Sequence, residues 1–205
     1  MKFYMTPGSC TTGIHILLEE LELVFEVHLV NLLNGDNHDK DYLAINPKGT
    51  IPALVTKDGT ALTDYQSIAY WLATSYPKAK LIPEEPTEAA LVIEKMNYAV
   101  STIHGEGFTR IFTTNKYSDN PQEYDTIKQQ GKAIINNAFL IMDKALENKD
   151  YIENSFTIAD SALFYVEFWA NKTDIPLPPN CRRHYQTMLQ RDAVRRVLRE
   201  EGYRV

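Results

Sequence analysis

The chain has 205 residues, of which 44% are apolar and 23% charged, and its formal net charge is −6. This is the composition of a globular protein with one or two domains, and the negative charge argues against nucleic acid as a partner, because nucleic acid requires a basic face. The sequence has no apolar run long enough to span a bilayer and no signal-peptide pattern at its start, so we expect a cytoplasmic protein that does not enter a membrane.

The first part of the chain alternates between strand and helix patterns. An apolar strand at 1–5 precedes a helix whose apolar residues recur at helical spacing over 12–23, and alternation over 24–32 predicts the next strand. The Lys-Asp-Gly sequence at 57–59 lies between two apolar runs and predicts a hairpin. Asp64 stands at the N-cap position of the helix that follows. The predicted order is β-α-β-α-β-β-α.

A segment at 77–86 contains three of the ten prolines and is typical of a linker. The chain after it has a helical pattern. Thr87 is expected to cap the first helix, and the Asn-Pro pair at 120–121 places a proline in the first turn of another. Thr157 and Asp160 have the spacing of a capping box. We therefore predict an α/β domain at 1–76, a linker at 77–86 and an all-helical domain at 87–205.

Cys10 follows the first predicted strand and stands where the next helix begins. The helix dipole and the unpaired N–H groups at that position favour the thiolate form of a cysteine. Its neighbours are small and mostly polar, which suits a functional site: Gly8, Ser9, Thr11 and Thr12. A buried and inert cysteine is the alternative. The other cysteine, Cys181, is far away in sequence, so the two form neither a CxxC pair nor a zinc site, and we expect no metal.

Pro52 stands at the start of a predicted strand. Its missing N–H would lose a sheet hydrogen bond there unless the chain turns, and a tight X-Pro turn is a common position for a cis peptide bond. A cis bond would leave the backbone N–H and C=O of Ile51 pointing outward, where they could pair with an extended peptide. A trans proline in an ordinary loop is the alternative.

Four segments in this order resemble a cytosolic glutathione transferase, and most closely the bacterial beta class, which has a cysteine in its first loop. The segments are PGSC at 7–10, NPKGTIPAL at 46–54, LTDYQSIAYWLA at 62–73 and FTIAD at 156–160. The resemblance extends over nearly the whole chain. It implies a thioredoxin-like domain that binds glutathione as co-substrate, an all-α domain that builds a site for a small hydrophobic electrophile, and a homodimer.

The resemblance also implies roles for residues of the first domain. Cys10 would lie beside the glutathione sulfur, and Ile51, before a cis Pro52, would pair its backbone with the cysteinyl part of the tripeptide. Asp64 would hold the γ-glutamyl amino group. Tyr65, at the start of a helix whose dipole favours an anion, would meet the γ-glutamyl carboxylate.

In the helical domain the resemblance assigns further residues. His104 matches the beta-class histidine near the sulfur, where it would favour the thiolate as a donor or a cation. Asn97 matches an asparagine that reaches into the partner subunit's site. Phe108, Phe112 and Trp169 are candidates for the hydrophobic substrate site, although core packing also explains rings at this spacing.

The chain departs from the family pattern at two positions. Tyr65 stands where a serine is frequent, and Gly105 follows His104 where the beta class often has a lysine. Two functions are therefore open. The first is an enzyme that conjugates glutathione to hydrophobic electrophiles or exchanges thiols and disulfides through Cys10. The second is a non-catalytic binding or regulatory protein with the same fold.

Overall fold

The computed structural model describes residues 1–204, which group into two compact units. The first unit contains Met1–Ile82 together with the C-terminal residues from Leu189 on, and the second unit is Pro83–Met188. This division differs from the predicted one, because the last helix groups with the N-terminal residues and not with the other helices. No helix within 1–204 is long and apolar enough to cross a membrane.

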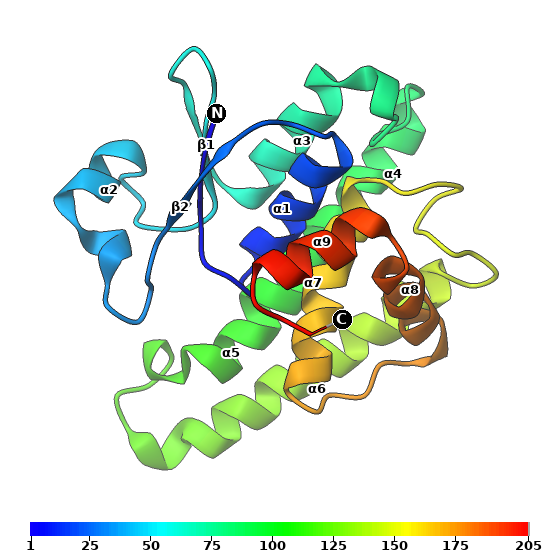
Figure 1. Ribbon diagram of the computed structural model, residues 1–205. Helices are drawn as coiled ribbons and strands as arrows, with labels where there is room; N and C mark the ends of the chain where they lie inside the picture. Colours follow the sequence, from blue (N-terminus) through cyan, green and yellow to red (C-terminus); the bar gives the residue numbers. More distant parts are fainter. Residues whose placement is uncertain (205) are drawn as a thin grey trace. The chain divides into compact units, whose positions relative to one another are not determined.

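The first unit is built on a four-stranded sheet with the order β2-β1-β3-β4, of which Figure 1 labels β1 and β2. Strand β1 pairs in parallel with β2 and antiparallel with β3, and β3 pairs antiparallel with β4. The predicted order β-α-β-α-β-β-α is confirmed. The elements are β1 (Lys2–Met5), α1 (Thr11–Glu20), β2 (Glu26–Leu29), α2 (Lys40–Ile45), β3 (Ala53–Val55), β4 (Ala61–Leu62), α3 (Tyr65–Ser75) and α9 (Asp192–Glu200).

Helix α1 is the centre of this unit. Every residue from Thr11 to Leu18 is buried, and the helix packs against both α3 and α9, the latter lying beside it in Figure 1. Edge strand β2 is shorter than predicted, and its Val27 and Leu29 side chains are exposed. The hairpin between β3 and β4 is confirmed, with Gly59 in the left-handed region at φ +89°.

The second unit is helical. Its first helix begins at Pro86, and the Glu85 carboxylate accepts the Glu88 N–H, so Glu85 and not Thr87 is the cap. The chain turns at Pro121 as predicted, where the Asn120 side chain caps a short 3-10 turn at Pro121–Glu123 and α6 follows at Tyr124. The elements are α4 (Pro86–Asn97), the π-helical stretch η3 (Tyr98–Phe108), α5 (Thr109–Phe112), α6 (Tyr124–Ala145), α7 (Ile158–Lys172) and α8 (Pro179–Leu189).

The π-helical stretch η3 and helix α6 approach each other at two glycines. A Cβ on Gly107 would lie 2.5 Å from a side-chain carbon of Ile135, and a Cβ on Gly131 would lie 2.8 Å from the Gly107 carbonyl oxygen. Neither position has room for a side chain. π-Helical turns are rare and occur frequently at functional sites, and this one carries His104.

A buried polar cluster joins helices α7 and α8. The predicted capping box is confirmed, because Thr157 and Asp160 bond to each other's backbone at the start of α7. His184 lies between two carboxylates, with Nδ1 2.8 Å from Glu167 and Nε2 3.2 Å from Asp160, and all three side chains are fully buried. Burial by itself would lower the pKa of His184, but the charges and hydrogen bonds of Glu167 and Asp160 outweigh it and raise the pKa to about 10.

Replacing His184 by alanine should therefore destabilise the protein. The variant leaves the Glu167 and Asp160 carboxylates buried without their cation, so we expect His184→Ala to lose about 3–5 kcal/mol of unfolding free energy at pH 7. Urea denaturation measures the difference. His38→Ala, at an exposed histidine, is the control and should change stability by less than about 0.5 kcal/mol.

The wild type and His184→Ala together also test whether His184 is charged. Its pKa in the folded protein lies above the ordinary value of 6.5, so its contribution is complete below that pH and is lost as the pH rises through about 10. The gap between wild type and His184→Ala should shrink over this range. A constant gap from pH 6 to pH 10.5 would mean that His184 is not an imidazolium.

Candidate active site

Cys10 occupies the N-cap position of α1 and is 7% exposed. The chain reaches it through Gly8, which has φ +71° and lies so close to the Tyr203 hydroxyl that a Cβ would overlap it. The Cys10 thiol lies 3.6 Å from the Ile51 carbonyl oxygen and donates a hydrogen bond to it. Cys10 and Ile51, both predicted to lie at the glutathione site, are therefore in contact.

The expectation that the start of the helix makes Cys10 acidic is wrong for this structure. Burial raises the pKa of the Cys10 thiol to about 12. The hydrogen bonds of the Cys10 and Thr11 N–H groups and the Ser9 hydroxyl lower it by less, and the negative charge of Asp64 raises it further. Cys10 is thus a thiol at neutral pH, since the loss of water outweighs the attraction of the helix terminus.

The turn before β3 has the predicted geometry, because the Ile51–Pro52 peptide bond is cis. Two side chains hold the residue in front of it: the Tyr42 hydroxyl and the Asn46 amide both donate to the Thr50 carbonyl oxygen. Ile51 is partly exposed and Pro52 is buried. Two hydrogen bonds therefore hold the Thr50 carbonyl group, which directly precedes the cis turn.

Asp64 lies at the N-cap position of α3, but its side chain does not cap the helix. One carboxylate oxygen accepts the Thr50 hydroxyl at 2.9 Å, and the other lies 2.8 Å from Lys48 Nζ. The Tyr65 side chain is 2% exposed and belongs to the core. Lys48 and Thr50 were missed in the sequence, although both lie in the segment that carries Pro52.

His104 lies on η3 in the second unit. Its Nδ1 is 3.2 Å from the Tyr165 hydroxyl, and its ring stands edge-on to Trp169 with 4.8 Å between centroids. Burial lowers the pKa of His104 to about 4. The imidazole is therefore neutral at pH 7, which contradicts its expected role as a cation and leaves the role of donor or acceptor.

The three candidate pocket rings form one cluster with His104. Phe108, Phe112 and Trp169 lie with 5.2–5.5 Å between their centroids. Phe108 is fully buried and is a core residue, whereas Phe112 is 50% exposed and Trp169 is 8% exposed. Only Phe112 therefore presents a large ring face to solvent. Asn97 is exposed at the last position of α4.

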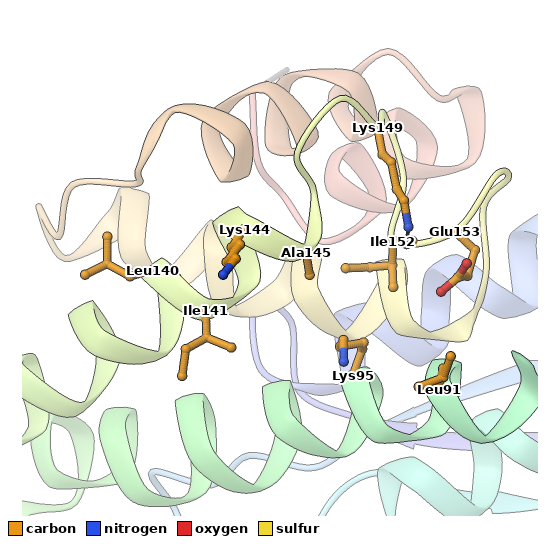
Figure 2. Close-up of a pocket in the computed structure, with 9 residues that line it drawn as sticks. All are labelled: Leu91, Lys95, Leu140, Ile141, Lys144, Ala145, Lys149, Ile152 and Glu153. Carbon is orange, nitrogen blue, oxygen red and sulfur yellow. Dashed lines mark hydrogen bonds between the residues drawn. The ribbon is translucent and has the colours of Figure 1, made fainter. Parts of the chain in front are cut away.

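A groove also runs between α4 and α6 in the second unit (Figure 2). It has a volume of about 540 Å³. Three of its apolar side chains, Leu91, Leu140 and Ile141, are 46–61% exposed. Its lining is Leu91, Lys95, Leu140, Ile141, Lys144, Ala145, Lys149, Ile152 and Glu153.

The high pKa of Cys10 predicts how its thiol reacts. Only the thiolate is alkylated, so the rate of iodoacetamide modification at Cys10 should be low at pH 7 and rise about tenfold per pH unit up to pH 10. Peptide mass spectrometry separates Cys10 from Cys181. N-acetylcysteine is the control, and its rate should level off above its pKa of about 8.5. A Cys10 rate that is already constant at pH 7 would contradict the buried thiol.

Comparison with known proteins identifies the family. Residues 8–75 match the family model described as "Glutathione S-transferase, N-terminal domain". Glutathione S-transferase GstA of Escherichia coli O157:H7 is 34% identical, over 98% of this chain and 99% of its own.

Two solved structures agree with this relationship. A glutathione transferase homologue from Sulfitobacter with bound glutathione is 27% identical with a TM-score of 0.88, over 97% of both chains. The beta-class glutathione S-transferase of Sphingomonas chungbukensis is 28% identical with a TM-score of 0.84, over 98% of this chain and 99% of its own. With GstA at 34% identity over nearly its full length, this chain belongs to the glutathione S-transferases and is a glutathione transferase enzyme.

Proposed function

We propose that the enzyme conjugates glutathione to small hydrophobic electrophiles and that Cys10 serves as a hydrogen-bond donor to the glutathione sulfur. The observation that carries this role is the buried, protonated Cys10 thiol. Its single proton is donated to the Ile51 carbonyl oxygen in this structure and would turn to the glutathione sulfur when the tripeptide binds beside Ile51. A thiol of this kind stabilises a neighbouring thiolate better than it attacks a disulfide, because attack requires loss of its proton. In conjugation the glutathione thiolate forms the C–S bond, and the leaving group departs with its electron pair.

The first unit supplies groups that suit a zwitterionic tripeptide. Ile51 beside the cis Pro52 would pair its backbone with the cysteinyl part, and Asp64 would bind the γ-glutamyl amine while the α3 dipole at Tyr65 favours the carboxylate. Lys48 next to Asp64 offers a cation to a second carboxylate. Cys10 and Cys181 are free thiols, which suits the cytoplasm, where glutathione is reduced.

In the second unit we assign roles on the electrophile side of the reaction. His104, as a neutral imidazole beside the Tyr165 hydroxyl, would act as a hydrogen-bond donor. The exposed Phe112 and the Trp169 edge would contact an apolar substrate, with Phe108 packed behind them as support. Apolar contact of this kind selects for size more than for chemistry.

Substitution of Cys10 tests the donor role. Cys10→Ser keeps a donor and should retain most of the conjugation of glutathione to chlorodinitrobenzene. Cys10→Ala removes a hydrogen bond to a charged sulfur, worth about 1.5–3 kcal/mol, and should lower kcat/KM about ten- to a hundredfold. The measurement is the initial rate at saturating glutathione and at varied electrophile.

Thiol–disulfide exchange is the competing activity of the same residue. Incubation with oxidised glutathione at pH 7, followed by intact mass, should give little or no adduct on Cys10. If one glutathione adds rapidly to wild type and not to Cys10→Ala, while conjugation survives the substitution, then Cys10 is a nucleophile and the donor role is wrong.

We also propose that two copies of the chain pair through the groove on α4 and α6. Its exposed apolar residues need cover, and pairing of the same groove on two copies would bury them on both chains. Asn97, on the same helix α4, would then reach the partner's site.

Sedimentation tests the pairing. The wild type should sediment as a dimer at micromolar concentration, and the double variant Leu140→Glu/Ile141→Glu as a monomer, because it buries two new charges at the contact. Val24→Glu, at an apolar residue of the first unit that is even more exposed, is the control and should stay dimeric. A monomeric wild type would exclude the dimer and the role of Asn97.

A further inference from the structure

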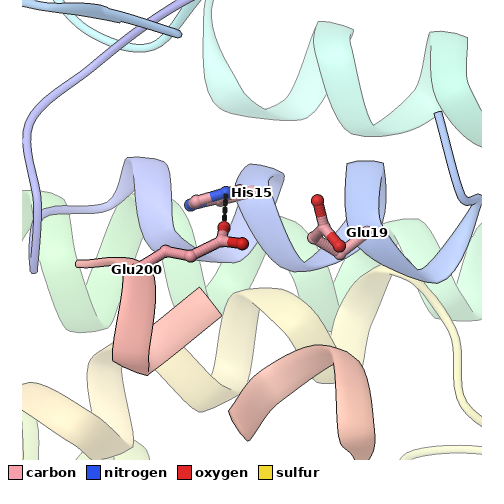
Figure 3. Close-up of side chains that lie close together, drawn as sticks. All are labelled: His15, Glu19 and Glu200. Atoms are coloured by element: carbon pink, nitrogen blue, oxygen red, sulfur yellow. Dashed lines mark ion pairs between the residues drawn. The ribbon is translucent and has the colours of Figure 1, made fainter. Parts of the chain in front are cut away.

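Three side chains that could bind a metal ion meet where helix α9 packs on α1 in the first unit. His15 and Glu19 are one turn apart on α1, and Glu200 is the last residue of α9. One ligand atom from each lies within 4.8 Å of the other two, and Figure 3 shows the His15 ring facing the Glu200 carboxylate. Nothing in the glutathione chemistry described above uses these groups.

The neighbouring Glu201 determines how His15 is protonated. Its Oε2 accepts the Gly8 N–H and the Thr12 hydroxyl, each at 2.7 Å, and its Oε1 lies 3.0 Å from His15 Nδ1. A carboxylate that accepts two other hydrogen bonds is an acceptor here as well, so we assign the proton of His15 to Nδ1. In this tautomer the lone pair of the ring lies on Nε2.

That second nitrogen has no hydrogen-bond partner among the described residues, although the His15 side chain is only 4% exposed. Nε2 lies 3.3 Å from Glu200 Oε2, close enough for an ion pair but without the alignment of a hydrogen bond. A lone pair that faces a carboxylate is repelled unless a cation lies between them. A histidine whose other nitrogen donates to a carboxylate is the usual form of a metal-binding imidazole.

We propose that His15 Nε2, Glu19 and Glu200 bind a divalent cation of the zinc type, with Glu201 orienting the imidazole. One nitrogen and two carboxylate oxygens are a ligand set that suits zinc, with water completing the shell. Glu200 is 50% exposed, which gives the ion a path from solvent. The ion would join α9 to α1.

One cation already competes for the site. Arg196 on α9 lies 2.7 Å from Glu19 Oε2, so that oxygen is shared. Glu19 then contributes its other oxygen to the ion, and we expect an affinity weaker than that of a site without an arginine. Arg191, just before α9, pairs with Glu20 Oε1 at 2.6 Å.

Zinc titration of the full chain tests the site. Isothermal calorimetry on Cys10→Ser, which removes the free thiol of the first unit, should give one Zn²⁺ per chain, and Co²⁺ should give visible absorption without a sulfur charge-transfer band. Glu200→Gln and Glu19→Gln in the same background should each weaken binding at least about tenfold. Glu147→Gln, at an exposed glutamate of the second unit, should bind as tightly as the parent.

The thermal midpoint provides a second measurement. A cation that binds only the folded protein should raise Tm with increasing zinc concentration in the parent and in Glu147→Gln, but not in Glu200→Gln. Circular dichroism checks that each variant is folded. Absence of saturable binding below 1 mM zinc, or equal binding by the parent and Glu200→Gln, would overturn the proposal and make the cluster an ion pair with an imidazolium.

Discussion

The burial of helix α1 determines the chemistry of this protein. Residues 11–18 are all buried, and α3 and α9 both pack against the helix. Cys10, at the N-cap of the same helix, is buried as well. A thiol in such a position keeps its proton, whatever the helix dipole favours. The burial that builds the core of the first unit therefore makes Cys10 a donor of hydrogen bonds rather than a ready nucleophile.

Both units hold a buried charged side chain between hydrogen-bond partners from another segment. In the first unit the Glu201 carboxylate is surrounded by three donors from the N-terminal loop and α1. In the second unit His184 lies between Glu167 and Asp160. Glu201 thereby links the end of α9 to α1, and His184 links α8 to α7. These polar contacts fix the position of each helix pair in addition to apolar packing.

Local patterns in the sequence predicted what local interactions determine. The order of elements, the hairpin at Gly59, the cis bond before Pro52 and the capping box of α7 all depend on residues close in sequence, and all are present. The ionisation of Cys10 could not be predicted in this way, because it depends on burial in the folded unit and on groups from other segments, such as the Asp64 carboxylate and the Ile51 carbonyl.

The same limit explains the boundary of the first unit. Helix α9 joins α1 through pairs such as Arg191 with Glu20, which are 171 positions apart, and no local pattern shows such a contact. His104 is neutral because it is buried beside Tyr165 and Trp169. The sequence pattern of a helix does not show whether a histidine on it is buried, so this protonation state could not be predicted. Glu85 caps α4 in place of the predicted Thr87, because the helix already begins at Pro86, one residue before Thr87.

The contact between Gly8 and Glu201 spans 193 positions, which has a consequence for the order of folding. During synthesis the strands of the first unit leave the ribosome long before the residues that close their core. The second unit, whose residues all lie between them, can fold as soon as it emerges. The first unit must wait for α9, and its late closure places the cysteine loop among the last parts of the protein to become ordered.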